Sequence, residues 1–144
     1  MPDERQRADA QARQFVLTTV WQGLSEFADQ INAETDQIAT LAVDPTAELA
    51  GVSLRVYPVA SRPVQTTPLF RFAVAVSSSG FGVRVHFVAQ PAVINGQVRS
   101  EERGELTMPG AGQGGPVTLQ DVRDDVARRY QAVVAAQTAP ARHT

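Results

Sequence analysis

The sequence contains no cysteine, which excludes disulfide bonds, a thiolate nucleophile and any metal site with cysteine ligands. Lysine is also absent, because all 13 basic residues are arginine. This excludes lysine Schiff-base chemistry, a lysine general base and the phosphate-binding lysine of P-loops. The same bias, with abundant Ala, Val, Gly and Pro, indicates a GC-rich bacterial genome. No cofactor and no metal site are expected.

Long hydrophobic runs are absent as well. No apolar stretch approaches the ~20 residues that span a bilayer, and the N-terminal sequence MPDERQRADAQAR lacks the continuous apolar region of a signal peptide. We therefore expect no membrane association and a cytoplasmic location. With a net charge of −2, nucleic-acid binding requires a local basic patch.

A chain of 144 residues is long enough for one domain with a sizeable core. We place this domain at residues 15–137, between a flexible N-terminal arm (1–14) and a disordered tail (138–144). The first element expected is a long helix that begins at Phe15. Its apolar residues recur every seven positions in two series: Leu17, Leu24, Ile31 and Ile38, then Val20, Phe27 and Leu41. The second series has one interruption, at Glu34.

This spacing predicts an amphipathic helix and, if the helix continues to Leu41, a coiled-coil seam. Such a helix is about 40 Å long, against about 27 Å for an eight-residue strand. It therefore either breaks near Asn32–Thr35 or packs its surplus length on a second subunit. We take one set of residues as the candidate self-association helix: Leu17, Val20, Leu24, Phe27 and Ile31.

The most regular pattern lies at 69–89, LFRFAVAVSSSGFGVRVHFVA, which predicts two strands joined by a Ser/Gly turn. Alternation places eight apolar residues on one face: Phe70, Phe72, Val74, Val76, Phe81, Val83, Val85 and Phe87. The opposite face carries Arg71, Arg84 and His86 among small side chains. The first face is expected to be core, and the second poses the question of what touches it.

Two further strands complete the predicted sheet. One is expected at Val52–Val59, after a connector at 43–50. We place this strand at an edge of the sheet, because Pro58 cannot donate a ladder hydrogen bond. The dipeptide Asn95-Gly96 predicts a two-residue hairpin turn. Its register pairs Val93 with Val98 and Phe87 with Gly104, and sets Glu105 opposite His86. It also puts Glu102 on the apolar side, so a bulge or a sheet end is expected near Pro91.

The last element expected is a helix from Leu119 to about Ala136. Thr118 and Asp121 have the spacing of a capping box, and Asp124–Arg128 and Asp125–Arg129 have the spacing of helical ion pairs. The predicted fold class is α+β: a four-stranded antiparallel β-meander with the long N-terminal helix and the C-terminal helix packed on one face.

Two motifs have the composition of catalytic or phosphate sites. Gly110, Gly112 and Gly115 match G-x-G-x-x-G, but no parallel βαβ unit surrounds them, which favours a linker, or a lid over a ligand. His86 is the only histidine outside the tail. Ser77–Ser79 are expected at the hairpin turn, away from it, and no G-x-S-x-G motif exists. His86 is therefore interpreted as a surface residue paired with Glu105.

The remaining candidate is the basic face of the sheet, a partner- or anion-binding surface of five residues: Arg55, Tyr57, Arg71, Arg84 and His86. Sheets can bind single-stranded nucleic acid with basic and aromatic residues, but Tyr57 is the only aromatic here, and Glu101 and Glu105 reduce the charge. The absence of a catalytic set favours a non-catalytic interaction module, a homodimeric adaptor or chaperone-like protein with an unidentified protein partner. The alternatives are single-stranded nucleic-acid binding, and a small-ligand or enzymatic domain with a Gly-rich lid.

Overall fold

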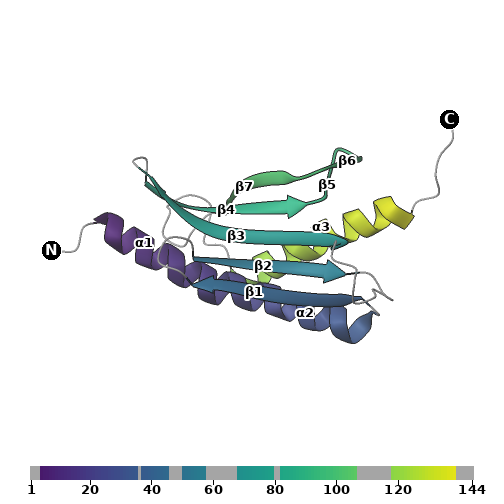
Figure 1. Ribbon diagram of the computed structural model, residues 1–144, viewed down its shortest axis with the longest axis horizontal. Coiled ribbons are helices and arrows are strands. Elements are labelled where there is room, and N and C mark those ends of the chain that lie inside the picture. Colours follow the sequence, from purple (N-terminus) through teal and green to yellow (C-terminus); the bar gives the residue numbers. More distant parts are fainter. Residues whose placement is uncertain are drawn as a thin grey trace.

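An N-terminal helical rod and a C-terminal helix pack against one face of an antiparallel sheet (Figure 1). The computed structural model describes residues 4–35, 37–45, 50–57, 68–79, 82–106 and 118–138. The elements follow one another as α1 (Glu4–Phe15), η1 (Val16–Val20), α2 (Trp21–Glu34), β1 (Ile38–Pro45), β2 (Ala50–Tyr57), β3 (Phe70–Ser79), β4 (Gly82–Gln90), β5 (Ala92–Ile94), β6 (Gln97–Arg99), β7 (Glu102–Leu106) and α3 (Leu119–Thr138).

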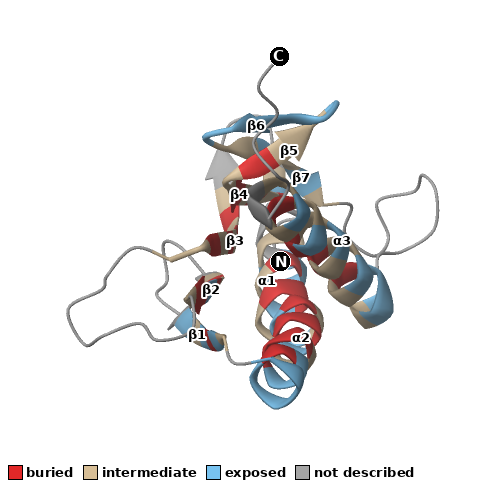
Figure 2. Cartoon of the chain, turned by 90° about the vertical axis from the view of Figure 1, so that its right-hand side faces the viewer, coloured by how far each residue is buried: buried red, intermediate tan, exposed pale blue. Residues whose placement is uncertain are grey.

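The main sheet has five strands in the order β1-β2-β3-β4-β7, and β5 and β6 form a separate two-stranded sheet. All pairs are antiparallel. The α+β class and the meander are confirmed, with one strand more than predicted. Figure 2 shows all three helices on the same side of the sheet. The core therefore lies between this side of the sheet and the helices.

The N-terminal helix begins at Glu4 rather than at Phe15, so most of the segment expected to be an arm is helical. Ala12 is completely buried in the core, and an Arg13 Nε–Asp9 Oδ2 ion pair of 2.7 Å spans one helical turn. This segment has no large apolar residues before Phe15, so its sequence lacks the periodic signal on which the prediction depended. Its buried contacts use a small side chain, which makes no such pattern.

The helix ends at Glu34, within the range in which the prediction allowed a break, and Thr35 is its C-cap. This residue has an extended backbone (φ −132°, ψ 170°), and its N–H donates to the Ile31 carbonyl at 3.0 Å. Ile38 and Leu41 therefore belong to strand β1, and continuation of the heptad series to Leu41 is wrong. The single interruption of that series, at Glu34, marked the end of the helix.

Strand β1 is the element that the sequence prediction missed. The segment interpreted as a connector at 43–50 supplies the end of β1 and the first residue of β2, and 46–49 lie outside the described residues. Because β1 pairs with β2 along its whole length, β2 is an internal strand and not an edge strand. The predicted strand at Val52–Val59 begins two residues earlier, at Ala50, and positions 58 and 59 lie outside the described residues.

The hairpin at β3 and β4 has the predicted faces. Val74 lies opposite Phe87, and the rings of Phe72 and Phe87 stack with centroids 5.6 Å apart. Six of the eight predicted core residues are buried, Val83 is partly buried, and Phe81 lies outside the described residues: the buried ones are Phe70, Phe72, Val74, Val76, Val85 and Phe87.

The register of the later strands is also confirmed. Asn95 and Gly96 form the turn with φ of 52° and 79°, the left-handed conformation that Asn and Gly adopt most readily. Val93 pairs with Val98, and Phe87 pairs with Gly104. The main sheet ends at Gln90, before Pro91, and the chain forms the β5–β6 hairpin before it returns as β7.

Helix α3 begins with the predicted capping box. The Thr118 N–H donates to Asp121 Oδ2 at 2.8 Å, and the Asp121 N–H donates to Thr118 Oγ1 at 3.1 Å. Asp125 pairs with Arg129 as predicted, whereas Arg128 also bonds to Asp125 and not to Asp124. The glycine motif at 110–115 and the tail at 139–144 lie outside the described residues.

Tyr130 joins α3 to both other layers, and its burial predicts a pH dependence of stability. The residue is 7% exposed, its ring packs edge-on against Phe27 and Phe70, and burial raises its pKa above the ordinary 10.0. The unfolded chain therefore loses this proton first, so the free energy of unfolding falls as pH rises above about 10, by at most about 1.4 kcal/mol per pH unit. Urea unfolding should show a smaller alkaline loss for Tyr130→Phe; equal losses would contradict the assignment.

Candidate functional site

The sheet has one face that no described helix or strand covers (Figure 2). We call it the outer face. Residues of even number on β1 and of odd number on β2 and β3 point to it, opposite to the buried residues of the same strands. Its described side chains include Thr40, Ala42, Ser53, Arg55, Tyr57, Arg71, Ala73, Ala75, Ser77, Arg84, His86, Val88, Gln90, Arg103 and Glu105.

The candidate self-association helix, by contrast, lies inside the subunit. Its residues contact the inner face of the sheet and α3: Val20 and Leu24 are completely buried, Phe27 and Ile31 are nearly so, and Leu17 is partly buried against the core. These side chains are not free to form a seam with a second copy. The heptad spacing is present, but the same spacing also suits a helix that packs on a sheet. Here the chain's own sheet covers the apolar stripe of the helix.

The structure divides the five predicted residues of the basic face into two groups. Arg55 lies directly opposite Arg71 on neighbouring strands, and Tyr57 is two residues from Arg55 on the same face. Arg84 and His86 lie opposite Ser77 and Ala75, near the other end of β3. Arg71 and Ala75 are four positions apart on β3, a separation of about 13 Å. The basic face is therefore two sites and not one patch.

At the second of these sites the positive charge is neutralised. Arg84 Nη1 donates to both carboxylate oxygens of Glu105, at 2.9 and 3.2 Å. Glu105 lies opposite His86, as the register predicted, but the predicted His86–Glu105 pair is not formed. Instead, His86 Nε2 lies 2.8 Å from Ser77 Oγ. We call this cluster of Ser77, Arg84, His86 and Glu105 the neutral end of the outer face.

The Ser77–His86 contact corrects the expectation that the serines lie away from the histidine. The distance equals that of a nucleophile and its general base in hydrolases. A triad also requires a carboxylate that orients the imidazole, and the nearest one in the strand register, Glu105, is bonded to Arg84. Among the described residues, the pair therefore has a hydrogen bond without the remaining catalytic groups.

At the first site the positive charge remains. Arg71 Nη1 donates to the neutral amide oxygen Oε1 of Gln90 at 3.0 Å, and Gln90 Nε2 donates to Glu101 Oε1 at 3.1 Å. Glu101 also bonds to Arg103; the hydrogen bonds from Arg103 and Gln90 lower the pKa of Glu101, and Glu101 raises that of Arg103. The Glu101 carboxylate thus neutralises Arg103 rather than Arg71.

Arg55 has no ion pair or hydrogen bond with any described residue, although it lies opposite a second arginine. Like charges directly opposite each other on neighbouring strands are destabilising. We call Arg55, Tyr57 and Arg71 the basic end of the outer face. A carboxylate or another anion placed there gains hydrogen bonds from two guanidinium groups and removes their repulsion.

A shallow hollow borders the basic end. It has a volume of about 280 Å³ and lies over β1, β2 and β3. Its lining includes five small residues and one arginine: Ala42, Gly51, Ser53, Ala73 and Ala75, and Arg71. Small side chains across three neighbouring strands leave room for a side chain from another molecule. The sequence showed the small residues of β3, but the hollow required β1, which was not predicted.

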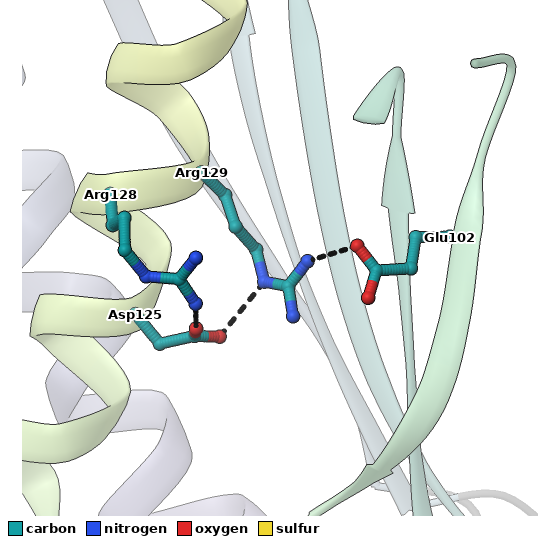
Figure 3. Close-up of polar contacts among 4 residues, drawn as sticks. All are labelled: Glu102, Asp125, Arg128 and Arg129. Atoms are coloured by element: carbon teal, nitrogen blue, oxygen red, sulfur yellow. Dashed lines mark hydrogen bonds and ion pairs between the residues drawn. The ribbon is translucent and has the colours of Figure 1, made fainter. Parts of the chain in front are cut away.

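Sequence reasoning also missed a polar cluster on the inner face, centred on Arg129 of α3 (Figure 3). Its Nη1 donates to Glu102 of β7 at 2.7 Å, its Nε donates to Asp125 at 2.9 Å, and its guanidinium lies 4.5 Å from the ring centroid of Phe87. Desolvation lowers the pKa of Arg129, but the bonds to Asp125 and Glu102 outweigh it and raise that pKa overall. The predicted register did place Glu102 on the apolar side of the sheet, but it did not identify Arg129 as the partner of Glu102.

Comparison of the chain with family models, with curated proteins and with solved structures gives no match. Within the described residues, no group of three or more histidine and acidic side chains could hold a metal ion. None of the described helices has the length and apolar character needed to cross a membrane. The functional argument therefore depends on the outer face itself.

Proposed function

We propose that this chain is a non-catalytic protein-interaction module, a homodimeric adaptor or chaperone-like protein that binds a partner polypeptide on the outer face of its sheet. One observation supports the proposal above all. The core is closed by helices on one side only, and the uncovered side combines an open hollow with two arginines that carry no carboxylate partner among the described residues.

The chemistry of this surface indicates what the partner presents. A carboxylate can accept hydrogen bonds from Arg55 and Arg71 together, and charge-assisted bonds of this kind are about twice as strong as neutral ones. An apolar side chain next to it fills the hollow over Ala73 and Ala75. The partner segment therefore combines an Asp or Glu with a neighbouring apolar residue. A cytoplasmic, bacterial setting belongs to the same proposal.

Single-stranded nucleic acid is the second candidate ligand. The grouping of Tyr57 with two arginines favours it, because aromatic stacking and basic charge act together in such binders. Arg84 argues against it, since Glu105 neutralises that residue. The Gly-rich lid hypothesis concerns residues 110–115, which lie outside the described residues.

Selection from a displayed library of random peptides tests the first proposal. Peptides that carry an acidic residue beside an apolar one should be enriched, and their affinity should fall at least about tenfold for Arg71→Ala, which removes charge-assisted bonds. Ala73→Leu should have a similar effect by filling the hollow. Isothermal titration of the selected peptides measures both changes.

Ala10→Leu is the matched control, because Ala10 is exposed on α1, away from the sheet's outer face. It should leave peptide binding unchanged. Selected peptides that bind all three variants equally contradict the proposal. Titration with an oligothymidylate decides the alternative: binding that weakens steeply with salt and in both Arg71→Ala and Arg84→Ala supports nucleic acid instead.

A further inference from the structure

We infer that strand β1 pairs antiparallel with β1 of a second copy, across a two-fold axis at Ala42, so that one sheet continues through both subunits. This inference rests on the homodimeric part of the proposed function and supplies its surface. The buried seam of the N-terminal helix cannot serve that purpose, whereas β1 forms one edge of the main sheet.

The two edges of the main sheet differ in how they are protected. Strand β7 is five residues long, and three of them are charged: Glu102, Arg103 and Glu105. Charge on a short edge strand opposes pairing with another chain. The β1 edge has no charged residue from Ile38 to Val43. Ile38 is 49% exposed and Val43 is 46% exposed, which is unusual for large hydrophobic side chains.

The free backbone groups of β1 can be assigned from one contact. The Asn32 side chain bonds to both backbone groups of Ala39: its Nδ2 donates to the Ala39 carbonyl at 3.0 Å, and its Oδ1 accepts from the Ala39 N–H at 2.8 Å. Ala39 therefore directs these groups away from β2. Because backbone groups alternate along a strand, Leu41 and Val43 also direct theirs toward the open edge.

These free groups match one antiparallel register with a second copy. With Ala42 opposite itself, Leu41 lies opposite Val43 and Val43 opposite Leu41, and every N–H and C=O of these residues finds a partner. Beyond them Ala39, already bonded to Asn32, lies opposite Pro45, which has no N–H to donate. The two positions that cannot complete a pair thus face each other.

The same register continues the apolar layer. Leu41 and Val43 lie opposite the buried Leu54 and Val52 of β2 and share their face. Directly opposite residues have Cβ atoms about 4.5–5.5 Å apart. Each Val43 therefore contacts Leu41 of the second copy, and its exposed surface becomes covered on pairing.

The absence of cysteine allows a direct test of this register, by introducing single cysteines. Ala42 forms a non-hydrogen-bonded pair with itself, with Cα atoms about 4.5 Å apart, within the range of disulfides. Thr40, on the same face, lies roughly 14 Å from its counterpart. Under mild oxidation Ala42→Cys should form a covalent dimer on a non-reducing gel, and Thr40→Cys should remain a monomer.

A second measurement uses sedimentation across a tenfold or wider range of concentrations. Val43→Lys places a charge on the edge and should weaken the dimer at least about tenfold. Val98→Lys is the matched control, since Val98 is 61% exposed on β6, and it should have no effect. If the wild type is a monomer throughout, both the homodimer and this inference are wrong. If the wild type is a dimer but the two cysteine variants behave alike, only the pairing through β1 is wrong.

Discussion

Replacing Phe72 by alanine should lower the free energy of unfolding by about 3–5 kcal/mol. Phe72 is 1% exposed and stacks on Phe87, near the open end of the β3–β4 hairpin, where it lies opposite Ala89. The substitution removes a whole ring from the core and leaves a cavity that strands on both sides prevent from collapsing. A domain of this size has about 5–15 kcal/mol of stability, so the variant should be folded but marginal.

Urea unfolding followed by far-ultraviolet circular dichroism measures this loss. Val98→Ala is the control, because that side chain is mostly exposed, and it should change the free energy by no more than about 0.5 kcal/mol. A loss below about 1 kcal/mol for Phe72→Ala would mean that the two layers do not close over this ring as described.

Arg129→Ala should have the second-largest effect, a loss of about 2–3 kcal/mol. The Arg129 side chain is 15% exposed and bonds to two carboxylates that are themselves largely shielded: Glu102 is 34% exposed and Asp125 is 27% exposed. Its removal leaves both carboxylates without this cation on the inner side of the sheet. The contact with the Phe87 ring is lost as well.

Arg128→Ala provides a matched control one residue away. Arg128 bonds to the same Asp125, but its side chain is 71% exposed. Surface ion pairs contribute about 0–1 kcal/mol, so the control should lose no more than this. Denaturant unfolding of both variants gives the comparison. Similar losses of unfolding free energy in the two variants would show that the Arg129 contacts do not stabilise the packing of α3 on β7.

The different environments of Arg128 and Arg129 could not be predicted from their spacing in the sequence. Both lie four residues after an aspartate, and the helical spacing predicts the same surface ion pair for each. Only the position of β7 decides that Arg129 meets Glu102 on the inner face. The sequence did place Glu102 on that face, because the Asn95-Gly96 turn determines the register of the strands that follow it.

The candidate site was predictable in its parts and not as an assembly. Strand alternation placed Arg55 and Arg71 on one face, and the meander made them neighbours. Whether their charge is neutralised depends on side-chain directions across three strands. Glu105 bonds to Arg84 rather than to His86, and Gln90 rather than a carboxylate meets Arg71.

Local sequence signals were enough to predict three features: the β3–β4 hairpin, the Asn95-Gly96 turn with its register, and the capping box of α3. In each case a few neighbouring residues have only one low-energy arrangement. Three other features depend on contacts between elements far apart in the sequence: the end of the long helix, the presence of β1 and the uncovered outer face. The spacing of Ile38 and Leu41 favours a helix, since a strand places them on opposite faces. Only the position beside β2 and the Asn32 contact select the strand.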